Sequence, residues 1–432
     1  MRSALKLILI SVILFSCSQK AFVKHLKKEI ISIENTFQDN MGFLLYDPLT
    51  RKTLFEYNAA DYFTPASNTK ILTFYTSLQL LGDSIPALKY IVRNDSLIFW
   101  GTGDPSFLYH NVWDNARTFN FLKNTPHQLF FSDTNFQTTH FGPGWAWDDY
   151  NFSFSSERSP FPAYGNVYSI ASSALDSLVT TPSMFSSYVT KSGDIRNTPQ
   201  VVRNKDSNHA TFYPGKLRLL DTLHVPFRYN NMLLAELLTD TLKRTVTNVS
   251  IPQPSETTIL HGIPSDSLYR VMMEDSDNFI AEQLLLLCAD AVSDTLKTEI
   301  AINYAKKNFL FDLPDKPLWR DGSGLSRYNL ITPRSIVRLW EKIYTKVPPE
   351  RLFKLLATGG DSGTIQNYFK AEKPYIFGKT GTLSNNYSLS GFLVTQTGKT
   401  LIFAWMNNNY PTSVTDVRKR MEPVMRSIHD HY

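Results

Sequence analysis

The sequence predicts a mixed fold of the α/β (α+β) class, in which segments from both ends of the chain build one antiparallel sheet. Three observations lead to this prediction. Residues 40–57 alternate apolar and polar side chains around a turn, and the last hundred residues hold three strand-like runs followed by a helix. Residues 83–264 are instead dense in Ser, Thr, Asn, Pro and Tyr, with short strand-like runs. We therefore expect one sheet-and-helix domain that carries a large β-rich insertion.

Individual elements follow from local patterns. Strands are expected at 41–46 and 53–57, because the turn-forming residues 47–50 separate them as in a hairpin. Residues 71–81 have the apolar spacing of a helix, which ends at Gly82. Further elements are expected as helices at 266–288, 332–344 and 414–428, and as strands at 91–93, 96–100, 375–377, 388–395 and 400–406.

The composition excludes several classes of protein. The chain has 432 residues, of which 42% are apolar and 19% are charged, so it can bury a core and is not a disordered chain. Lys and Arg number 44 against 39 Asp and Glu, a formal charge of +5 without a dense basic run. This weak field gives no reason to expect nucleic acid as a partner. The many aromatic residues are expected to serve packing before carbohydrate stacking.

The first 17 residues are typical of an export signal. Arg2 and Lys6 supply a positive start, and residues 7–15 form an apolar run too short to span a bilayer. Leu14-Phe15-Ser16-Cys17 resembles a bacterial lipobox, in which Cys17 would be lipidated. The alternative is an ordinary cleaved signal with a chance cysteine. We expect a periplasmic lipoprotein that meets the membrane only through its N-terminal lipid anchor.

Cysteine and histidine usage gives no metal or cofactor site. Cys17 and Cys288 are the only cysteines, so a disulfide framework is not available if Cys17 carries lipid. Cys288 lies in an apolar run and is expected to be a buried structural thiol. The nine His are scattered, with a tight pair only at His429 and His431.

Three short motifs occur in an informative order: Ser67-Asn68-Thr69-Lys70, Ser276-Asp277-Asn278 and Lys379-Thr380-Gly381. Each is weak alone, but together they form the set of penicillin-binding proteins and class A β-lactamases. At positions i and i+3 of a helix, the Ser67 hydroxyl and the Lys70 amine share one face. The amine can then accept the proton of the attacking hydroxyl. The motifs therefore predict acyl transfer through a serine nucleophile.

The other motif residues receive roles from the same chemistry. Ser276 can relay a proton to the leaving amine, and the Asn278 amide can hold the substrate backbone. Lys379 adds a positive charge, which would lower the pKa of Lys70 and attract a substrate carboxylate.

The third motif is expected to lie on a strand beside the nucleophile. Gly381 would let the acyl chain approach that strand without a Cβ clash. The hydroxyls of Thr380 and Thr382 can bind a carboxylate. The backbone N–H groups of Ser67 and Thr382 are the expected oxyanion hole.

With these residues, the chain resembles the class C low-molecular-mass penicillin-binding proteins of peptidase family S13. The resemblance covers nearly the whole mature chain. It implies a β-lactamase/transpeptidase-like domain with an antiparallel sheet and a helical subdomain, and a serine-type D-Ala-D-Ala carboxypeptidase/endopeptidase that cleaves peptidoglycan stem peptides and is inhibited by β-lactams. Its supporting stretches are 101–105, 142–145 with Asp148-Asp149, 321–326, 378–383 and 389–393.

The resemblance also suggests a domain division. Residues 1–17 would be the signal peptide with its lipobox, and residues 83–264 the inserted β-rich region. Residues 21–82 and 265–432 would together form the catalytic domain.

Two alternatives remain open. A serine β-lactamase would need fast deacylation, but the Glu-x-x-Leu-Asn element of class A enzymes is missing after Ser276. Glu282, on the same helix, is expected to serve packing or an ion pair. A catalytically inactive cell-wall-binding lipoprotein would not need the intact motif residues. The sequence does not distinguish carboxypeptidase from endopeptidase preference, nor does it identify the third residue of the stem peptide.

Overall fold

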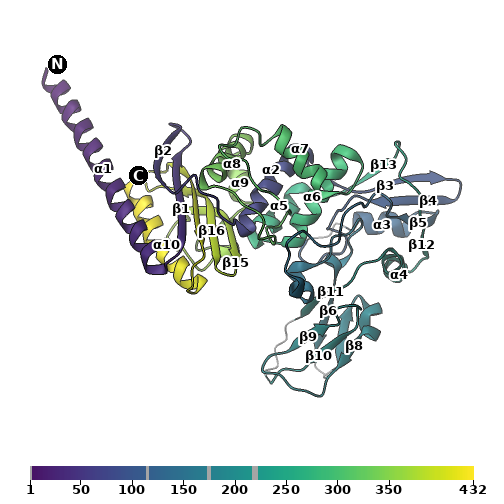
Figure 1. Cartoon of the computed structure of the whole chain (residues 1–432). Helices are drawn as coiled ribbons and strands as arrows, with labels where there is room; N and C mark the ends of the chain where they lie inside the picture. Colours follow the sequence, from purple (N-terminus) through teal and green to yellow (C-terminus); the bar gives the residue numbers. More distant parts are fainter. Residues whose placement is uncertain (1, 113–115, 173–176, 217–221) are drawn as a thin grey trace. The chain divides into compact units, whose positions relative to one another are not determined.

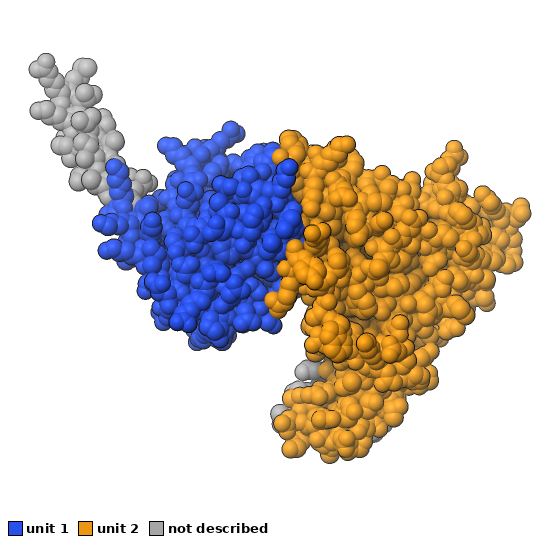
Figure 2. All heavy atoms as spheres, viewed as in Figure 1, with its two compact units in different colours: residues 1–71, 312–318, 329–432 blue, residues 72–311, 319–328 orange. Residues whose placement is uncertain are grey.

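A computed structural model describes residues 2–112, 116–172, 177–216 and 222–432, with side chains described from residue 20 onward except Ser172. The chain divides into two compact units, coloured separately in Figure 2. Unit 1 comprises residues 1–71, 312–318 and 329–432, and unit 2 comprises residues 72–311 and 319–328. Each unit is described by itself.

Unit 1 is built around a six-stranded sheet of order β14-β15-β16-β17-β1-β2. The N-terminal strands pair antiparallel with C-terminal ones: Phe43 in β1 lies opposite Trp405 in β17, and Leu389 in β16 lies opposite Thr380 in β15. One sheet from both ends of the chain is thus confirmed. The strands are β1 (Asn40–Asp47), β2 (Lys52–Tyr57), β14 (Ala357–Thr358), β15 (Ile376–Leu383), β16 (Asn386–Val394) and β17 (Thr400–Asn408).

Helices cover both faces of this sheet. The apolar core on one face is closed by α1 (Arg2–Phe37) and α10 (Val414–His431), which lie side by side in Figure 1. On the other face α8 (Pro333–Lys346) contacts β17, β1 and β16, and α9 (Pro349–Phe353) follows it. The predicted C-terminal helix continues to His431, because Val424, Met425 and Ile428 are buried in the core.

The predicted signal peptide, including Cys17, falls in the part of α1 whose side chains lie outside the description. No helix among the described residues has both the length and the apolar character needed to cross a bilayer. From Leu26 to Phe37, α1 instead buries apolar side chains in the core of unit 1.

Unit 2 holds the predicted β-rich region, whose described residues form three sheets. The largest has the order β12-β5-β4-β3-β13, and the two others are β8-β10-β9 and β11-β6-β7. Their strands are β3 (Ser84–Arg93), β4 (Ser96–Gly101), β5 (Gln128–Ser132), β6 (Val167–Ser172), β7 (Leu178–Thr181), β8 (Val189–Lys191), β9 (Gln200–Arg203), β10 (Ala210–Tyr213), β11 (Leu223–Pro226), β12 (Val246–Asn248) and β13 (Thr258–Pro264).

The helices of unit 2 include several that the sequence placed outside the insertion. They are α3 (Arg117–Asn124), α4 (Asn231–Leu242), α5 (Ser265–Arg270), α6 (Asn278–Ser293), α7 (Thr298–Asn308) and α2 (Lys70–Leu80), which starts in unit 1. The compact units therefore group residues 72–82 and 265–311 with the inserted region, whereas the sequence-based division kept these segments with the sheet of unit 1.

The helix expected over residues 266–288 is interrupted. A π-helical turn, η6 (Val271–Asp275), follows α5, and the chain then breaks at Ser276, whose φ of 68° is left-handed. Asp277 caps the next helix by accepting a hydrogen bond from the N–H of Ile280 at 2.8 Å. The segment is helical as expected, with a break at residues 276–277 that the apolar spacing does not reveal.

Candidate active site

In unit 1, the first motif forms a tight turn at the start of α2. A short 3-10 helix, η1 (Ala66–Thr69), runs directly into α2 at Lys70. This turn places the Nζ of Lys70 2.8 Å from the Oγ of Ser67, a distance at which a proton can pass between them. Lys70 is fully buried, whereas Ser67 is half-buried. The predicted pair of nucleophile and base is therefore in hydrogen-bond contact.

A buried hydrogen-bond network holds this turn against the sheet of unit 1. The Asn68 amide donates to the carbonyl oxygen of Lys379 at 3.0 Å and to the Ser388 hydroxyl at 2.8 Å. Its own oxygen accepts a hydrogen bond from Ser390. Ser388 also donates to the carbonyl oxygen of Pro65 at 2.7 Å. The network fixes the nucleophile turn relative to β15 and β16.

The third motif lies on β15, as its position near the C-terminus predicted. Lys379 is fully buried and donates to the carbonyl oxygen of Thr380 at 2.9 Å. The Thr380 hydroxyl donates to that of Thr364 at 2.7 Å. A Cβ on Gly381 would stand only 2.4 Å from the carbonyl oxygen of Pro65. Gly381 thus allows close contact between β15 and the nucleophile turn, a reason that the sequence did not suggest.

The expected oxyanion hole involves the same close approach. The backbone nitrogen of Ser67 lies 2.9 Å from the position that a Cβ on Gly381 would occupy. The Ser67 N–H is therefore adjacent to the strand that carries Thr382. Thr382 is exposed, and its hydroxyl lies 3.4 Å from a guanidinium nitrogen of Arg418. Unit 1 thus brings together all the predicted site residues of the first and third motifs.

The second motif lies in unit 2, at the break between η6 and α6. Ser276 takes the left-handed conformation at this break, and Asn278 is the first residue of α6. The Asn278 amide donates to the carbonyl oxygen of Phe154 at 3.0 Å. Asp277 accepts a hydrogen bond from the Tyr109 hydroxyl at 2.6 Å. These contacts fix the direction in which the motif leaves the turn.

A cavity of about 330 Å³ opens at this turn, lined by all three residues of the second motif. His110 and His224 stack in it, with ring centroids 4.0 Å apart and planes 9° from parallel. Burial, reinforced by His110, lowers the pKa of His224 to about 4. Burial also lowers the pKa of His110. The neutral forms of both rings are thereby favoured.

Glu282 and Cys288, for which the sequence predicts structural roles, are both buried in unit 2. The buried Glu282 carboxylate lies 3.4 Å from the guanidinium of Arg158, so it forms the ion pair that was one of its two expected roles. It also accepts the N–H of Ser323 at 2.7 Å, and burial raises the pKa of its carboxyl. Cys288 is a buried free thiol, as predicted, and burial raises its pKa to about 12. Among described residues, no cluster of three or more His, Cys, Asp or Glu side chains could hold a metal ion.

The supporting roles of Asn68, Ser388 and Ser390 were not expected from the sequence. A signal was present, because Ser388 and Ser390 are two positions apart on a strand and so point to one face. That face would otherwise be expected to be apolar, since the rest of β16 is buried. Trp340 of α8 completes the network by donating its indole N–H to Ser390 at 2.9 Å.

Solved structures share this fold. Penicillin binding protein 4 (dacB) from Haemophilus influenzae matches with a TM-score of 0.72 at 21% identity, over 90% of this chain and 95% of that chain. A predatory peptidoglycan endopeptidase from Bdellovibrio bacteriovorus matches with a TM-score of 0.53 at 15% identity, over 90% of this chain and 92% of that chain. The predicted fold class is thus confirmed.

Relatives in sequence cover similar spans. D-alanyl-D-alanine carboxypeptidase DacB of Haemophilus influenzae is 23% identical over 438 residues, which cover 90% of this chain and 89% of that protein. A penicillin-sensitive carboxypeptidase A of Dictyostelium discoideum is 22% identical, over 84% of this chain and 81% of that protein. A sequence profile of the D-Ala-D-Ala carboxypeptidase 3 (S13) family matches residues 23–430. Because this match spans nearly the whole chain, the protein belongs to the D-Ala-D-Ala carboxypeptidase 3 (S13) peptidase family.

Proposed function

We propose that the protein cleaves peptidoglycan stem peptides through an acyl-enzyme on Ser67 and that β-lactams inhibit it by acylating the same oxygen. As an S13 peptidase it is a serine-type D-Ala-D-Ala carboxypeptidase/endopeptidase. The observation that carries the assignment of Ser67 is the 2.8 Å contact between its Oγ and the buried Lys70 amine. A serine hydroxyl attacks a carbonyl effectively only when a base accepts its proton.

The first step is acylation. The Ser67 oxygen attacks the carbonyl carbon of the D-Ala–D-Ala bond and passes its proton to the Lys70 amine. The oxyanion of the tetrahedral intermediate accepts hydrogen bonds from the N–H groups of Ser67 and Thr382. The C–N bond then breaks, and the leaving amine takes a proton through Ser276. Water hydrolyses the resulting ester and restores the Ser67 hydroxyl.

The remaining site residues bind the substrate. Asn278 holds the substrate backbone, and Lys379 with the hydroxyls of Thr380 and Thr382 attracts its carboxylate. Support for Lys379 and Thr380 comes from their shared strand, β15, which the Asn68 network ties to the nucleophile turn. Ser276 and Asn278 are supported by their motif and by the cavity that they line.

We also propose where the protein works. Its substrate lies outside the cytoplasmic membrane, and the signal sequence at residues 1–17 would carry it there. Lipidation of Cys17 would then hold the mature protein at a membrane surface. Incorporation of labelled palmitate into the wild-type protein, but not into a Cys17→Ala variant, is the expected result. Equal labelling of the two proteins would reject the anchor.

The test of the chemistry is a time course of intact mass with excess penicillin, followed by peptide mapping. A long-lived adduct on the peptide that contains Ser67 is expected, and Ser67→Ala should form none. A transient adduct with rapid loss of penicillin would instead indicate the alternative, a serine β-lactamase. Absence of both adduct and penicillin loss would contradict the mechanism and favour the inactive cell-wall-binding protein.

A further inference from the structure

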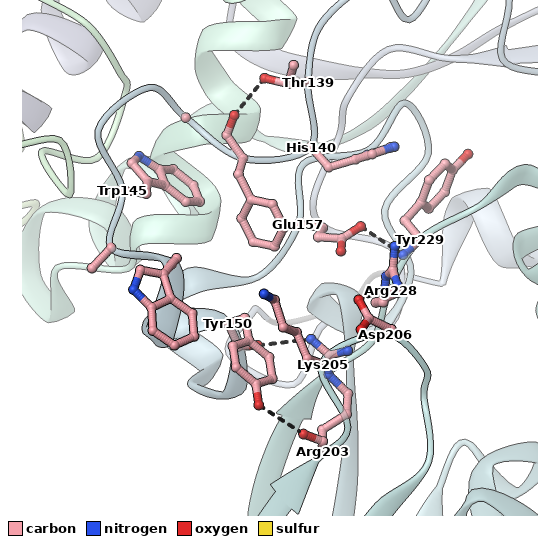
Figure 3. Close-up of a pocket in the computed structure, with 14 residues that line it drawn as sticks. Thr139, His140, Trp145, Tyr150, Glu157, Arg203, Lys205, Asp206, Arg228 and Tyr229 are labelled. Carbon is pink, nitrogen blue, oxygen red and sulfur yellow. Dashed lines mark hydrogen bonds and ion pairs between the residues drawn. The ribbon is translucent and has the colours of Figure 1, made fainter.

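Unit 2 contains a second, larger cavity, of about 580 Å³, to which the proposed chemistry gives no role. This volume falls in the range of small-molecule sites, about 300–1,000 Å³. Residues 139–150 form one wall, and residues 203–206 and 228–229 form another (Figure 3). None of the motif residues lines it. The cavity is therefore a candidate binding site of its own.

Aromatic rings supply the apolar walls of this cavity. Trp145 is oriented by a 2.8 Å hydrogen bond from its indole N–H to Asp321. Trp147 lines the cavity and leaves 74% of its surface exposed, so a ligand can contact the part of its ring that Lys205 does not cover. Tyr150 and Tyr229 also line the cavity, and both are labelled in Figure 3. An exposed tryptophan on a cavity wall is a binding surface for ligands with an apolar face.

Charged groups with unused hydrogen-bonding capacity complete the cavity. Glu157 is only 5% exposed, and one of its oxygens accepts the N–H of Tyr229 at 2.9 Å. No hydrogen bond reaches its second oxygen from any described residue. Arg203 is 2% exposed, and its Nε is buried without a partner in the described structure. The second Glu157 oxygen can accept a hydrogen bond from a polar ligand, whereas the Arg203 Nε is closed off from the cavity.

The charged side chains that line the cavity favour a ligand that is polar but has no net charge. Arg228 lies 3.7 Å from Asp206, so these two largely offset each other. The Lys205 ammonium lies over the Trp147 ring, 5.2 Å from its centroid. Glu157 would repel an anion, while Arg203 and Lys205 would repel a cation. A purely apolar ligand would leave the second Glu157 oxygen unpaired.

We propose that this cavity binds the glycan part of peptidoglycan, through a pyranose ring of an N-acetylated amino sugar. Such a ring is neutral, and its C–H face can stack on Trp147. Its hydroxyl groups can donate to Glu157 and accept from Lys205. This inference rests on the proposed function for the source of the sugar, because the stem peptides are attached to glycan strands. It adds a second point at which the protein holds its substrate.

The test is a calorimetric titration with two peptide-free probes, N-acetylchitotetraose and the disaccharide of N-acetylglucosamine and N-acetylmuramic acid. Binding of at least one probe is expected. Trp147→Ala should weaken it about tenfold or more, the effect of losing an aromatic contact of this kind. Combining Trp147→Ala with Glu157→Gln in a double variant should weaken sugar binding further. Phe311→Ala is the matched control, because this aromatic side chain is 72% exposed and does not line the cavity.

Three outcomes would overturn the inference: no binding of either probe, equal binding by Trp147→Ala and the wild type, or Trp147-dependent binding of a sugar-free stem peptide alone. Repeating the titration on penicillin-treated protein separates this test from that of the proposed function. Unchanged sugar affinity after acylation is expected, and loss of sugar binding on acylation would also reject a separate cavity. If no acyl-enzyme forms but the probes still bind through Trp147, the proposed chemistry fails and the glycan site stands.

Discussion

At the scale of single residues, the candidate site depends on the absence of a side chain at Gly381. The space that a side chain on Gly381 would need is occupied by backbone atoms of Pro65 and Ser67 and by the hydroxyl of Ser388 on β16. Asp39, at the start of the sheet, is only 6% exposed and accepts a hydrogen bond from Asn407. Both positions lead to predictions that do not depend on the identity of the substrate.

Gly381→Ala should slow penicillin acylation by roughly tenfold to a hundredfold, because displacing a nucleophile by an ångström has effects of that size. The added Cβ would stand 2.4 Å from the carbonyl oxygen of Pro65 and 2.9 Å from the Ser67 nitrogen, and neither backbone atom can move independently. Gly82→Ala is the control, since a Cβ there would meet nothing within 4 Å. Equal acylation rates in the Gly381→Ala and Gly82→Ala variants would contradict this account of Gly381.

Asp39→Asn should become more stable relative to the wild type as the pH rises from about 4 to about 6. Burial, with a smaller contribution from Glu34, raises the pKa of Asp39 from 3.8 to about 6. Between these values the native state binds the proton more tightly than the unfolded state does, so the contribution of Asp39 to stability falls with rising pH. The variant has no carboxyl group at this position, so its free energy of unfolding does not fall for this reason. Urea unfolding of both proteins from pH 4 to 7 measures the difference, and a difference independent of pH would refute it.

At the scale of elements, the interrupted helix before α6 presents the second motif. Ser276 can leave the helical path because η6 ends there and Asp277 starts a new helix through its cap. Tyr109, far earlier in the sequence, donates to Asp277 and so couples this cap to the loop after β4. The direction of Ser276 and Asn278 therefore depends on a tyrosine outside the motif.

Tyr109→Phe should reduce penicillin acylation severalfold and cost about 1.5–3 kcal/mol of unfolding free energy, the usual contribution of a hydrogen bond to a charged group. Without the hydroxyl, Asp277 keeps its bond to Ile280 and a 3.2 Å contact with Asn111. Tyr164→Phe removes a comparable 3.1 Å hydrogen bond to Thr241 and provides the control. A positioning role requires that Tyr109→Phe alone lower the acylation rate, so equal rates in the two variants would disprove it.

At the scale of the whole molecule, the nucleophile turn of unit 1 depends on residues at the far end of the chain. Chain ends that pair in one sheet, such as β1 with β17, make folding slow and sensitive to C-terminal loss. The helix that closes this sheet, α10, buries five apolar side chains in the core: Val417, Met421, Val424, Met425 and Ile428.

Truncation after residue 409, which removes α10, should abolish penicillin labelling although the catalytic motifs remain. Each buried apolar side chain contributes about 1.5–3 kcal/mol, so five together approach the whole stability of a typical domain, about 5–15 kcal/mol. Labelling and circular dichroism would measure the loss. Lys419→Ala, on the exposed face of α10, should leave both unchanged. A truncated protein that still labels at Ser67 would show that unit 1 folds without this helix.

Much of this architecture could be predicted, and the failures have identifiable causes. The hairpin of β1 and β2 and the strands β16 and β17 carry alternating apolar patterns, so their positions were visible. The third motif lies on a strand as expected, and β15 joins it to the apolar run predicted at 375–377, but the burial of the polar side chains of Lys379 and Thr380 depends on contacts that the local sequence does not record.

The contact between Ser67 and Lys70 was predicted, but the residues that hold this pair in place were not. Motif spacing identified Ser67 and Lys70, because a helical turn alone brings them into contact. The Asn68 network depends on pairing between residues more than 300 positions apart, which no local pattern records. The grouping of residues 72–82 with the inserted region is likewise set by tertiary packing.

The helix α1 also limits how far the enzyme could reach. Phe22 already packs against the core of unit 1, and only four residues separate it from Cys17. Even fully extended, that link spans about 17 Å. With a lipid on Cys17, the folded body would stay next to the bilayer that holds the lipid, and the wall within its reach would be the part closest to that bilayer.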